Sequence, residues 1–132
     1  MFLDASALIA MMTSEDEARN LASRLQRTKT RLTSPLAVCH AAAAVSLVLK
    51  LPMGEAEAAM DEFLELAGVK VMSLPAQITP LALEAFRRFG KGQGHPADLS
   101  MTDCFAYACA RYYRQPLLHK GGGFARTDLE TA

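Results

Sequence analysis

Short apolar stretches alternate with helical patterns of apolar and polar residues along the whole chain. The helices predicted from the spacing of apolar residues follow Asp4 and occupy residues 14–25, 35–50, 59–68, 80–89 and 100–115. The predicted strands lie at residues 1–3, around Leu32, at 69–74 and at 117–118. Strands separated by helices indicate a parallel sheet, because parallel strands need crossover connections. The pattern therefore predicts an α/β fold.

Polar residues, proline and glycine mark the ends of these helices. Ser14 and Glu17 have the spacing of a capping box, and Ser34–Pro35 is typical of a helix start. Gly68 is typical of a C-terminal cap. No internal repeat or linker interrupts the order of elements. We therefore expect residues 1–132 to form one domain, an αβα sandwich around a central, mostly parallel twisted sheet.

The composition is that of a globular domain without a large overall charge. Hydrophobic residues make up 51% and charged residues 21%, and fourteen Lys and Arg balance fourteen Asp and Glu. This balance excludes a general polyanion binder. The charge is uneven, however, because residues 1–86 carry seven basic and ten acidic side chains, whereas residues 87–132 carry seven and four. The C-terminal third is therefore the side compatible with contact to phosphates.

Cysteine spacing and the apolar segments bear on where the protein acts. Cys39, Cys104 and Cys109 lack the spacing of a disulfide framework or a zinc site, so we expect buried thiols in a reducing compartment. The first residues carry no basic leader, which speaks against a secretory signal. Leu32–Leu49 has no formal charge, but its polar side chains favour a buried core helix over a membrane span. We expect a cytoplasmic protein without membrane contact.

Asp4, His40 and Asp103 are the polar side chains expected to meet at one end of the sheet. Asp4 follows the first strand, His40 lies about two turns into the helix after the second, and Asp103 lies in the first turn of the 100–115 helix. Ligands of parallel sheets gather at the carboxyl ends of the strands. Carboxylates brought together there repel each other or share a cation, and oxygen ligands suit Mg²⁺ or Mn²⁺. The structural alternatives are a helix cap for Asp4 and a capping box of Ser100 with Asp103.

Six segments carry motifs in a fixed order along the chain. They are Met-Phe-Leu-Asp-Ala-Ser-Ala-Leu at 1–8, Thr-Ser-Pro-Leu-Ala-Val at 33–38, Arg-Phe-Gly-Lys-Gly at 88–92, His-Pro-Ala at 95–97, Thr-Asp-Cys-Phe-Ala-Tyr-Ala at 102–108, and Pro-Leu-Leu with Lys-Gly and Phe-Ala-Arg-Thr-Asp at 116–128. Together they resemble the VapC branch of the PIN-domain proteins. The resemblance implies an αβα sandwich, a Mg²⁺- or Mn²⁺-dependent endoribonuclease that is the toxin of a toxin–antitoxin pair, self-association, and neutralisation by a VapB-type antitoxin whose tail covers the site.

The resemblance assigns the metal ligands to Asp4 and Asp103, which match the first and third acids of the family pattern. His40 stands where the second acid is usual, and Gly123 stands where the fourth is usual. Asp4, Asp103 and His40 are thus the catalytic candidates. Two carboxylates hold Mg²⁺ more weakly than four, and imidazole suits Mn²⁺ or softer divalent ions better than Mg²⁺. We therefore expect weak metal binding that is shifted toward softer ions.

Further residues have supporting roles in this interpretation. Ser6 and Thr102 match the positions of supporting hydroxyls, and Asp128 belongs to a recurrent Thr-Asp pair. The candidates for RNA contact are Lys91, His95, Lys120 and Arg126. A homodimer or larger homo-oligomer is expected to form through apolar helix faces, although core burial explains the same residues equally well. These residues are Val45, Leu49, Met60 and Phe63.

Functions from different classes remain open on the sequence. A metal-dependent ribonuclease explains the order of the motifs. A catalytically silent PIN-fold protein that binds antitoxin or RNA explains the departures at His40 and Gly123. A nucleotide-binding regulator would use the loop at Lys120–Gly123, but this loop lacks the G-x-x-x-x-G-K-[ST] pattern, which favours a plain turn.

Overall fold

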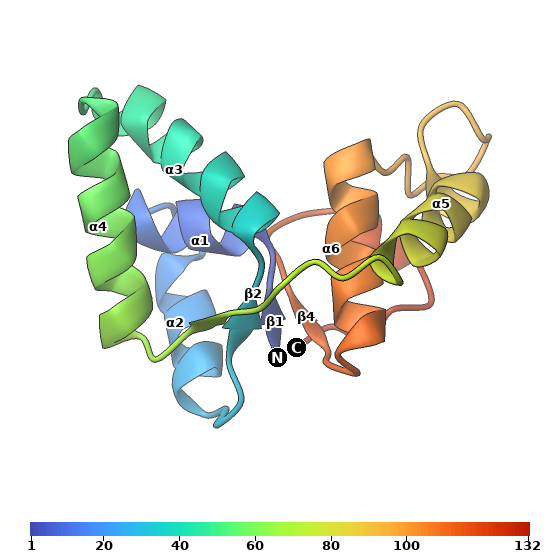
Figure 1. Cartoon of the computed structure of the whole chain (residues 1–132), viewed down its shortest axis with the longest axis horizontal. Coiled ribbons are helices and arrows are strands. Elements are labelled where there is room, and N and C mark those ends of the chain that lie inside the picture. The colour runs from blue at the N-terminus through green and yellow to red at the C-terminus, as the bar shows by residue number, and fades with distance from the viewer.

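Four short strands form a parallel sheet at the centre of the molecule, as a computed structural model of all 132 residues shows. The strands are β1 (Phe2–Leu3), β2 (Leu32–Thr33), β3 (Lys70–Val71) and β4 (Leu117–Leu118). Their order is β3-β2-β1-β4 (Figure 1). The chain moves outward from β1 to β3 and then returns to the other side of β1 with β4. The carboxyl ends of β1 and β4 therefore form the topological switch point, where ligands bind in sheets of this kind.

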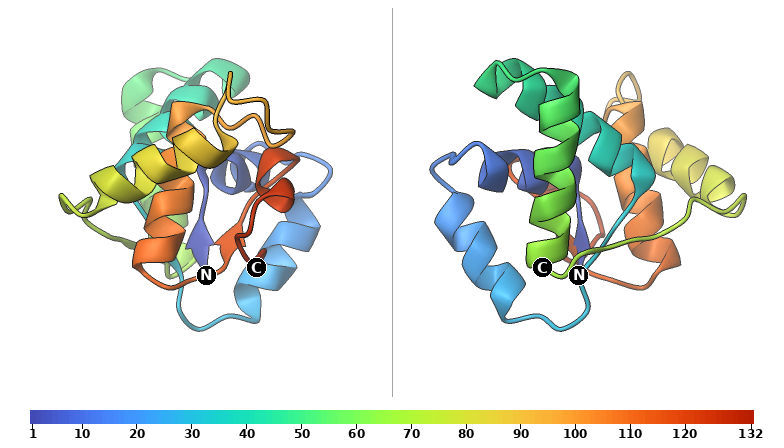
Figure 2. Two further views of the ribbon diagram at one scale, coloured as in Figure 1. Left: turned by 90° about the vertical axis from the view of Figure 1, so that its right-hand side faces the viewer. Right: turned by 60° about the vertical axis from the view of Figure 1, so that its left-hand side comes forward.

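Helices cover both faces of the sheet. They are α1 (Ala5–Met12), α2 (Ala18–Gln26), α3 (Pro35–Leu49), α4 (Met53–Leu66), α5 (Ile78–Phe89) and α6 (Met101–Tyr112), and a 3₁₀ turn, η1, spans Gly123–Arg126. Helices α1 to α4 lie on one face, and α5 and α6 lie on the other (Figures 1 and 2). The predicted α/β sandwich with a parallel sheet is confirmed. No helix has the length and apolar character that crossing a bilayer demands.

Two hydrophobic cores lie on the two faces of the sheet. Successive strand residues point to opposite faces. Leu3 and Leu118 accordingly pack with α1 to α4, whereas Phe2 and Leu117 pack with α5 and α6. The two ends of the chain lie side by side (Figures 1 and 2), where the backbone N–H of Ala132 donates to the carbonyl of Leu117 at 2.9 Å. The centre of the sheet is thus fully buried, and its rim is left for polar groups.

The predicted capping box of Ser14 with Glu17 is wrong. Ser14 has φ +55°, and the N–H of Glu15 donates to the carbonyl of Ala10 at 3.0 Å, so Ser14 ends α1 in a left-handed conformation. Helix α2 begins later, and Glu17 at its N-cap makes no side-chain capping bond. Ser14, which looks like the N-cap of the next helix in the sequence, therefore lies at the C-terminus of α1. Arg114 ends α6 with the same left-handed φ, +55°.

Strand β3 is shorter than the predicted strand at 69–74. Leu32 pairs with Lys70 and Thr33 with Val71, and the last ladder bond runs from the N–H of Met72 to the carbonyl of Thr33 at 2.8 Å. Strand β2 ends there because Ser34 caps α3. The edge strand has no other neighbour, so its pairing stops with that of β2.

Helix α3 is less buried than predicted. Cys39 is exposed, whereas Cys104 and Cys109 are buried as expected. The last turn of α3 is also exposed, and Leu47 is 80% accessible. The helix is apolar on nearly every side, so the hydrophobic pattern of the sequence does not indicate which face packs inward. The buried face is formed by residues Ala37, Ala41, Ala42 and Val45.

Candidate active site

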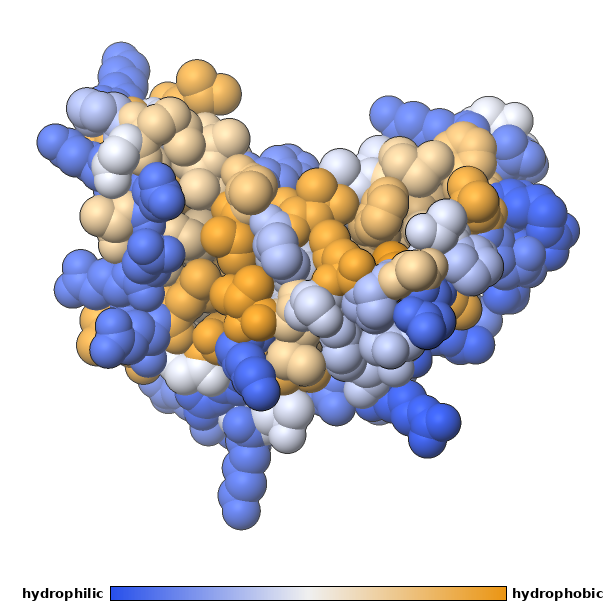
Figure 3. Space-filling view, in the orientation of Figure 1, coloured by the Kyte–Doolittle hydropathy of each residue, from blue (hydrophilic) through white to orange (hydrophobic).

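A cleft of about 200 Å³ lies between α3 and α6, at the carboxyl end of β1. The space-filling view shows a notch at the upper edge of the molecule between the two groups of helices (Figure 3). The polar residues of the cleft are Asp4, Ser6, Ser34, His40, Thr102 and Asp103, and its larger apolar residues are Ile9, Leu36 and Phe105. The cleft thus combines carboxylates and hydroxyls with an apolar wall.

Asp4 is the buried carboxylate of the cleft. It follows β1 directly and is the N-cap of α1, and its residue is only 7% exposed. Its Oδ2 accepts hydrogen bonds from the backbone N–H of Ser6 at 3.0 Å and from the hydroxyl of Ser6 at 2.6 Å. Burial raises the pKa of Asp4, and the negative charge of Asp103 raises this pKa further, while the bonds from Ser6 lower it. The predicted helix cap is therefore present at a carboxylate that also faces the cleft.

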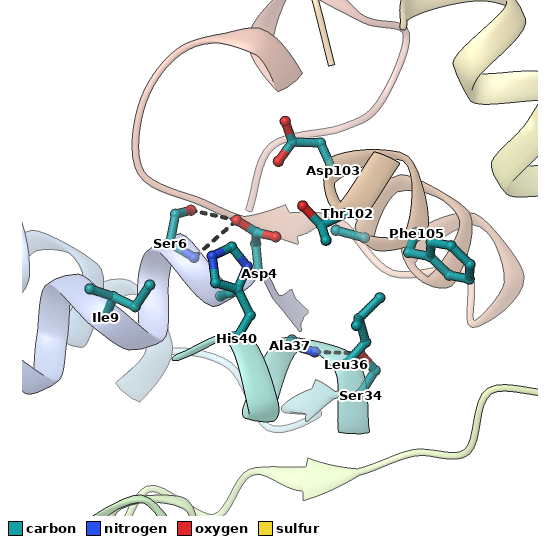
Figure 4. A pocket seen from close by; sticks show the side chains of 12 residues that line it. Asp4, Ser6, Ile9, Ser34, Leu36, Ala37, His40, Thr102, Asp103 and Phe105 are labelled. Atoms are coloured by element: carbon teal, nitrogen blue, oxygen red, sulfur yellow. Dashed lines mark hydrogen bonds between the residues drawn. The ribbon is translucent and has the colours of Figure 1, made fainter. Parts of the chain in front are cut away.

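Asp103 reaches the cleft from the first turn of α6. It forms a capping box with Ser100, because its Oδ2 accepts from the N–H of Ser100 at 3.0 Å and its own N–H donates to the hydroxyl of Ser100 at 3.2 Å. Figure 4 shows the carboxylates of Asp4 and Asp103 at the same opening, with Thr102 beside them. Asp103 can therefore cap α6 and face the cleft at the same time, because only Oδ2 accepts the capping bond and Oδ1 does not take part in it.

His40 faces the carboxylates from α3. It lies in the second turn of the helix that Ser34 caps, and its residue is exposed. In Figure 4 the imidazole rises from α3 toward Asp4 and Ser6. The cleft therefore brings together five residues that the sequence singles out, and these are Asp4, Ser6, His40, Thr102 and Asp103.

The donor set of the cleft fits a hydrated divalent cation. No three side chains of His, Cys, Asp or Glu converge closely enough to enclose a metal ion. Mg²⁺ nevertheless usually keeps several waters and is bound through one or two carboxylates. Asp4 and Asp103 are two carboxylates at one opening, and the charge of Asp103 adds to the effect of burial in raising the pKa of Asp4. Asp4 and Asp103 are the residues that would hold such an ion.

Asp128 lies outside the cleft, although its motif suggested a supporting role. Its Oδ1 accepts a hydrogen bond from the hydroxyl of Tyr107 at 2.5 Å, and its Oδ2 lies 3.3 Å from Arg88 and 3.7 Å from Arg111. These partners lower the pKa of Asp128 despite its partial burial. Through this hydrogen bond and these ion pairs, Asp128 links the C-terminal segment to α5 and α6.

The residues predicted to contact RNA also lie outside the cleft, and these are Lys91, His95, Lys120 and Arg126. The ammonium of Lys120 pairs with Glu15 and lies 3.9 Å from Glu17, so its charge is already compensated. The Nδ1 of His95 accepts a hydrogen bond from the N–H of Ala97 at 3.0 Å. A contact of any of these residues with RNA would therefore lie beyond the rim of the cleft.

The apolar wall of the cleft is absent from the sequence prediction. Phe105 and Leu36 flank the cleft from α6 and α3, and Ile9 closes it from α1 (Figure 4). Phe105 lies three residues after Thr102, so helical spacing places both on one face of α6. This spacing is the signal that identifies Phe105 once Thr102 is a candidate.

Comparisons with known proteins identify the family. The PIN domain family model matches residues 1–130. Ribonuclease VapC42 of Mycobacterium tuberculosis is 31% identical, covering 100% of this chain and 98% of its own. Ribonuclease VapC30 of the same organism is 34% identical, with 99% and 97% covered. A VapC ribonuclease of Rhizobium meliloti is 32% identical, with 97% and 98% covered.

A solved structure shares the fold. The crystal structure of Mycobacterium tuberculosis VapC20, described as a sarcin-ricin loop cleaving toxin, superposes with a TM-score of 0.73 at 19% identity. The match covers 99% of this chain and 97% of that protein. The family model and the full-length relatives agree with this likeness, and the chain therefore belongs to the PIN domain family, in its VapC ribonuclease branch.

Proposed function

We propose that the protein is a divalent-metal-dependent endoribonuclease, the toxin of a toxin–antitoxin pair, which hydrolyses RNA in the cytoplasm. The observation that carries this proposal is the meeting of the buried Asp4 with Asp103 at one cleft, at the switch point of the sheet. The relatives named VapC ribonucleases, which align over nearly the full chain, support the substrate class.

The residues of the cleft have different roles in phosphodiester hydrolysis. A divalent ion held by Asp4 and Asp103 would lower the pKa of a water molecule and offset charge on the phosphate. Ser6 fixes the orientation of Asp4 through two hydrogen bonds. The exposed His40 and the hydroxyl of Thr102 face the same opening, where they can hydrogen-bond phosphate oxygens.

The metal preference follows from the ligand types. Two carboxylates with a neighbouring imidazole offer less negative charge than four carboxylates. Imidazole is a better ligand for Mn²⁺ and softer divalent ions than for Mg²⁺. We therefore assign the site a weak affinity for Mg²⁺ and a preference for Mn²⁺ or a softer ion.

The partners proposed with this function are RNA, a VapB-type antitoxin whose tail covers the cleft, and a second copy of the chain. Of the apolar residues considered for self-association, Val45 and Met60 are buried in the core and are not available. Leu49 remains exposed, next to a group of exposed apolar residues at the α3–α4 connection. The other members of this group are Leu47, Val48 and Met53.

A catalytically silent binding protein is the second candidate function. It is favoured by the absence of three converging ligands and by the replacement of an acid by His40. RNA cleavage assays with metal-free, Mg²⁺-loaded and Mn²⁺-loaded protein separate the two functions.

We expect the wild type to cleave RNA faster in Mn²⁺ than in Mg²⁺ and to be inactive in EDTA. His40→Glu adds a carboxylate and should raise the Mg²⁺-dependent rate about tenfold, which corresponds to about 1.4 kcal/mol. If neither protein cleaves in any metal while both still bind RNA, the silent binding protein is the correct function.

A further inference from the structure

His119, the first residue after β4, is a buried histidine without a role in the proposed reaction. It is 9% exposed and packs against the ring of Phe124 at 5.1 Å between centroids. Its Nδ1 lies 2.8 Å from the carbonyl oxygen of Gly121, and its Nε2 lies 3.3 Å from the hydroxyl of Thr131. A carbonyl oxygen only accepts hydrogen bonds, so the proton of the neutral ring must be on Nδ1. Burial lowers the pKa of His119, which favours the neutral ring.

The contact with Gly121 holds the turn that follows β4. Gly121 has φ +78°, a conformation that side chains other than glycine rarely adopt. In the same turn, the backbone N–H of Lys120 donates to the hydroxyl of Ser6 at 3.0 Å. This N–H belongs to the peptide between His119 and Lys120, and the bond from the His119 ring to the carbonyl of Gly121 closes the short loop that contains this peptide.

The bond from Lys120 determines how Ser6 meets Asp4. The Ser6 oxygen accepts from the N–H of Lys120, and its single hydrogen is directed to Oδ2 of Asp4 at 2.6 Å. Asp4 thereby keeps one oxygen for Ser6 and turns the other toward the side of Thr102 and Asp103 (Figure 4). The order of contacts is His119 to Gly121, Lys120 to Ser6, and Ser6 to Asp4.

We propose that His119 is a positioning residue for Asp4, which acts through the turn at Lys120–Gly121 and through Ser6. The inference rests on the proposed function only in taking Asp4 as a metal ligand. The ion pair of Lys120 with Glu15 is a second anchor of the same turn. It holds a flexible side chain, however, whereas His119 holds the backbone whose N–H contacts Ser6. Removing a partner that hydrogen-bonds a metal ligand directly, as Ser6 does to Asp4, typically changes metal affinity by about 10- to 100-fold, and the effect expected for His119 is at the lower end of this range.

Three variants separate positioning from packing. His119→Phe keeps an aromatic ring against Phe124 but cannot donate to Gly121. In His119→Asn, the amide nitrogen replaces Nδ1 and keeps this donation. In His119→Gln, the amide nitrogen replaces Nε2 instead and loses it.

We expect ¹⁵N NMR of the metal-free wild type to show the proton on Nδ1 of His119. We expect His119→Phe and His119→Gln to exchange the amide hydrogens of Lys120 and Ser6 about tenfold faster and to bind Mn²⁺ about tenfold more weakly, with His119→Asn close to wild type.

Several results would overturn the proposal. One is a proton on Nε2 in the wild type, and another is unchanged exchange at Lys120 and Ser6 in His119→Phe. Losses in His119→Asn and His119→Gln, with His119→Phe close to wild type, would show that His119 only fills space against Phe124. If exchange responds as expected but the wild type binds no Mn²⁺, the positioning role stands and the proposed metal-dependent function fails. The NMR measurements use no metal, so the two failures are distinguishable.

Discussion

Asp4→Asn is expected to lower the rate of RNA cleavage at least about a thousandfold, or about 4 kcal/mol of activation free energy, while the fold stays intact. Asparagine is as good an N-cap as aspartate, so α1 keeps its first hydrogen bonds. The variant keeps one oxygen for Ser6 but loses the negative charge, and an amide nitrogen replaces the second oxygen that would bind a cation. Cleavage in saturating Mn²⁺ is the measurement, with circular dichroism to verify the fold.

The same substitution is expected to stabilise the metal-free protein at neutral pH. The pKa of Asp4 is raised in the folded state, chiefly by burial and then by Asp103, so the ionised carboxylate destabilises the fold at pH values above this raised pKa. The advantage of Asp4→Asn should shrink as the pH falls through the folded-state pKa. It should be absent below the ordinary pKa of aspartate, because both states then bind the proton.

A matched control is available on the surface. Asp61 lies exposed on α4, away from the cleft, so Asp61→Asn should leave both cleavage and the pH dependence of stability unchanged. Cleavage by Asp4→Asn at the rate of Asp61→Asn would mean that Asp4 has no part in the reaction.

Gly123→Asp, which adds the acid that the family pattern carries, is expected to destabilise the protein by about 1 to 3 kcal/mol. A Cβ at Gly123 would lie 2.5 Å from the carbonyl oxygen of Ala97 and 2.9 Å from the side chain of Leu99. The first of these is a backbone atom, which a rotamer change cannot move. The free energy of unfolding from urea denaturation is the measurement.

Gly122→Asp is the control for this substitution. Gly122 has φ −70°, and no atom lies within 4 Å of a Cβ at this position. The Gly122→Asp variant should therefore be as stable as the wild type or slightly more stable, because replacing glycine reduces the entropy of the unfolded chain. Equal stabilities of the two variants would show that the turn adapts freely. The structure also leads us to expect that His40→Glu with Gly123→Asp is less stable than His40→Glu alone.

The sequence predicts the fold well because its signals are local. Strands β1, β2 and β4 are each followed by a polar residue, as in Leu3–Asp4, and the helices between the strands supply the crossover connections that parallel pairing requires. This arrangement brings the residues after β1 close to the start of α6. The meeting of Asp4 and Asp103 could therefore be predicted from topology, although they are far apart along the chain.

The remaining features depend on partners that are distant in the sequence. Asp128 lies outside the cleft because it contacts Tyr107 and two arginines of α5 and α6. No local sequence pattern predicts these contacts. The link of His119 to Asp4 runs through backbone atoms at Lys120 and Gly121, which residue types do not reveal. The exposure of Cys39 could not be predicted for another reason: α3 is apolar on nearly every side, so the sequence does not indicate which face packs inward.

Mn²⁺ titration followed by electron paramagnetic resonance tests most directly whether Asp4 and Asp103 share one cation. We expect one binding site in the wild type, weakened strongly in Asp4→Asn and in Asp103→Asn, with the double variant little worse than either single one, because both carboxylates serve the same ion. Wild-type Mn²⁺ affinity that survives in both single variants would contradict a shared site.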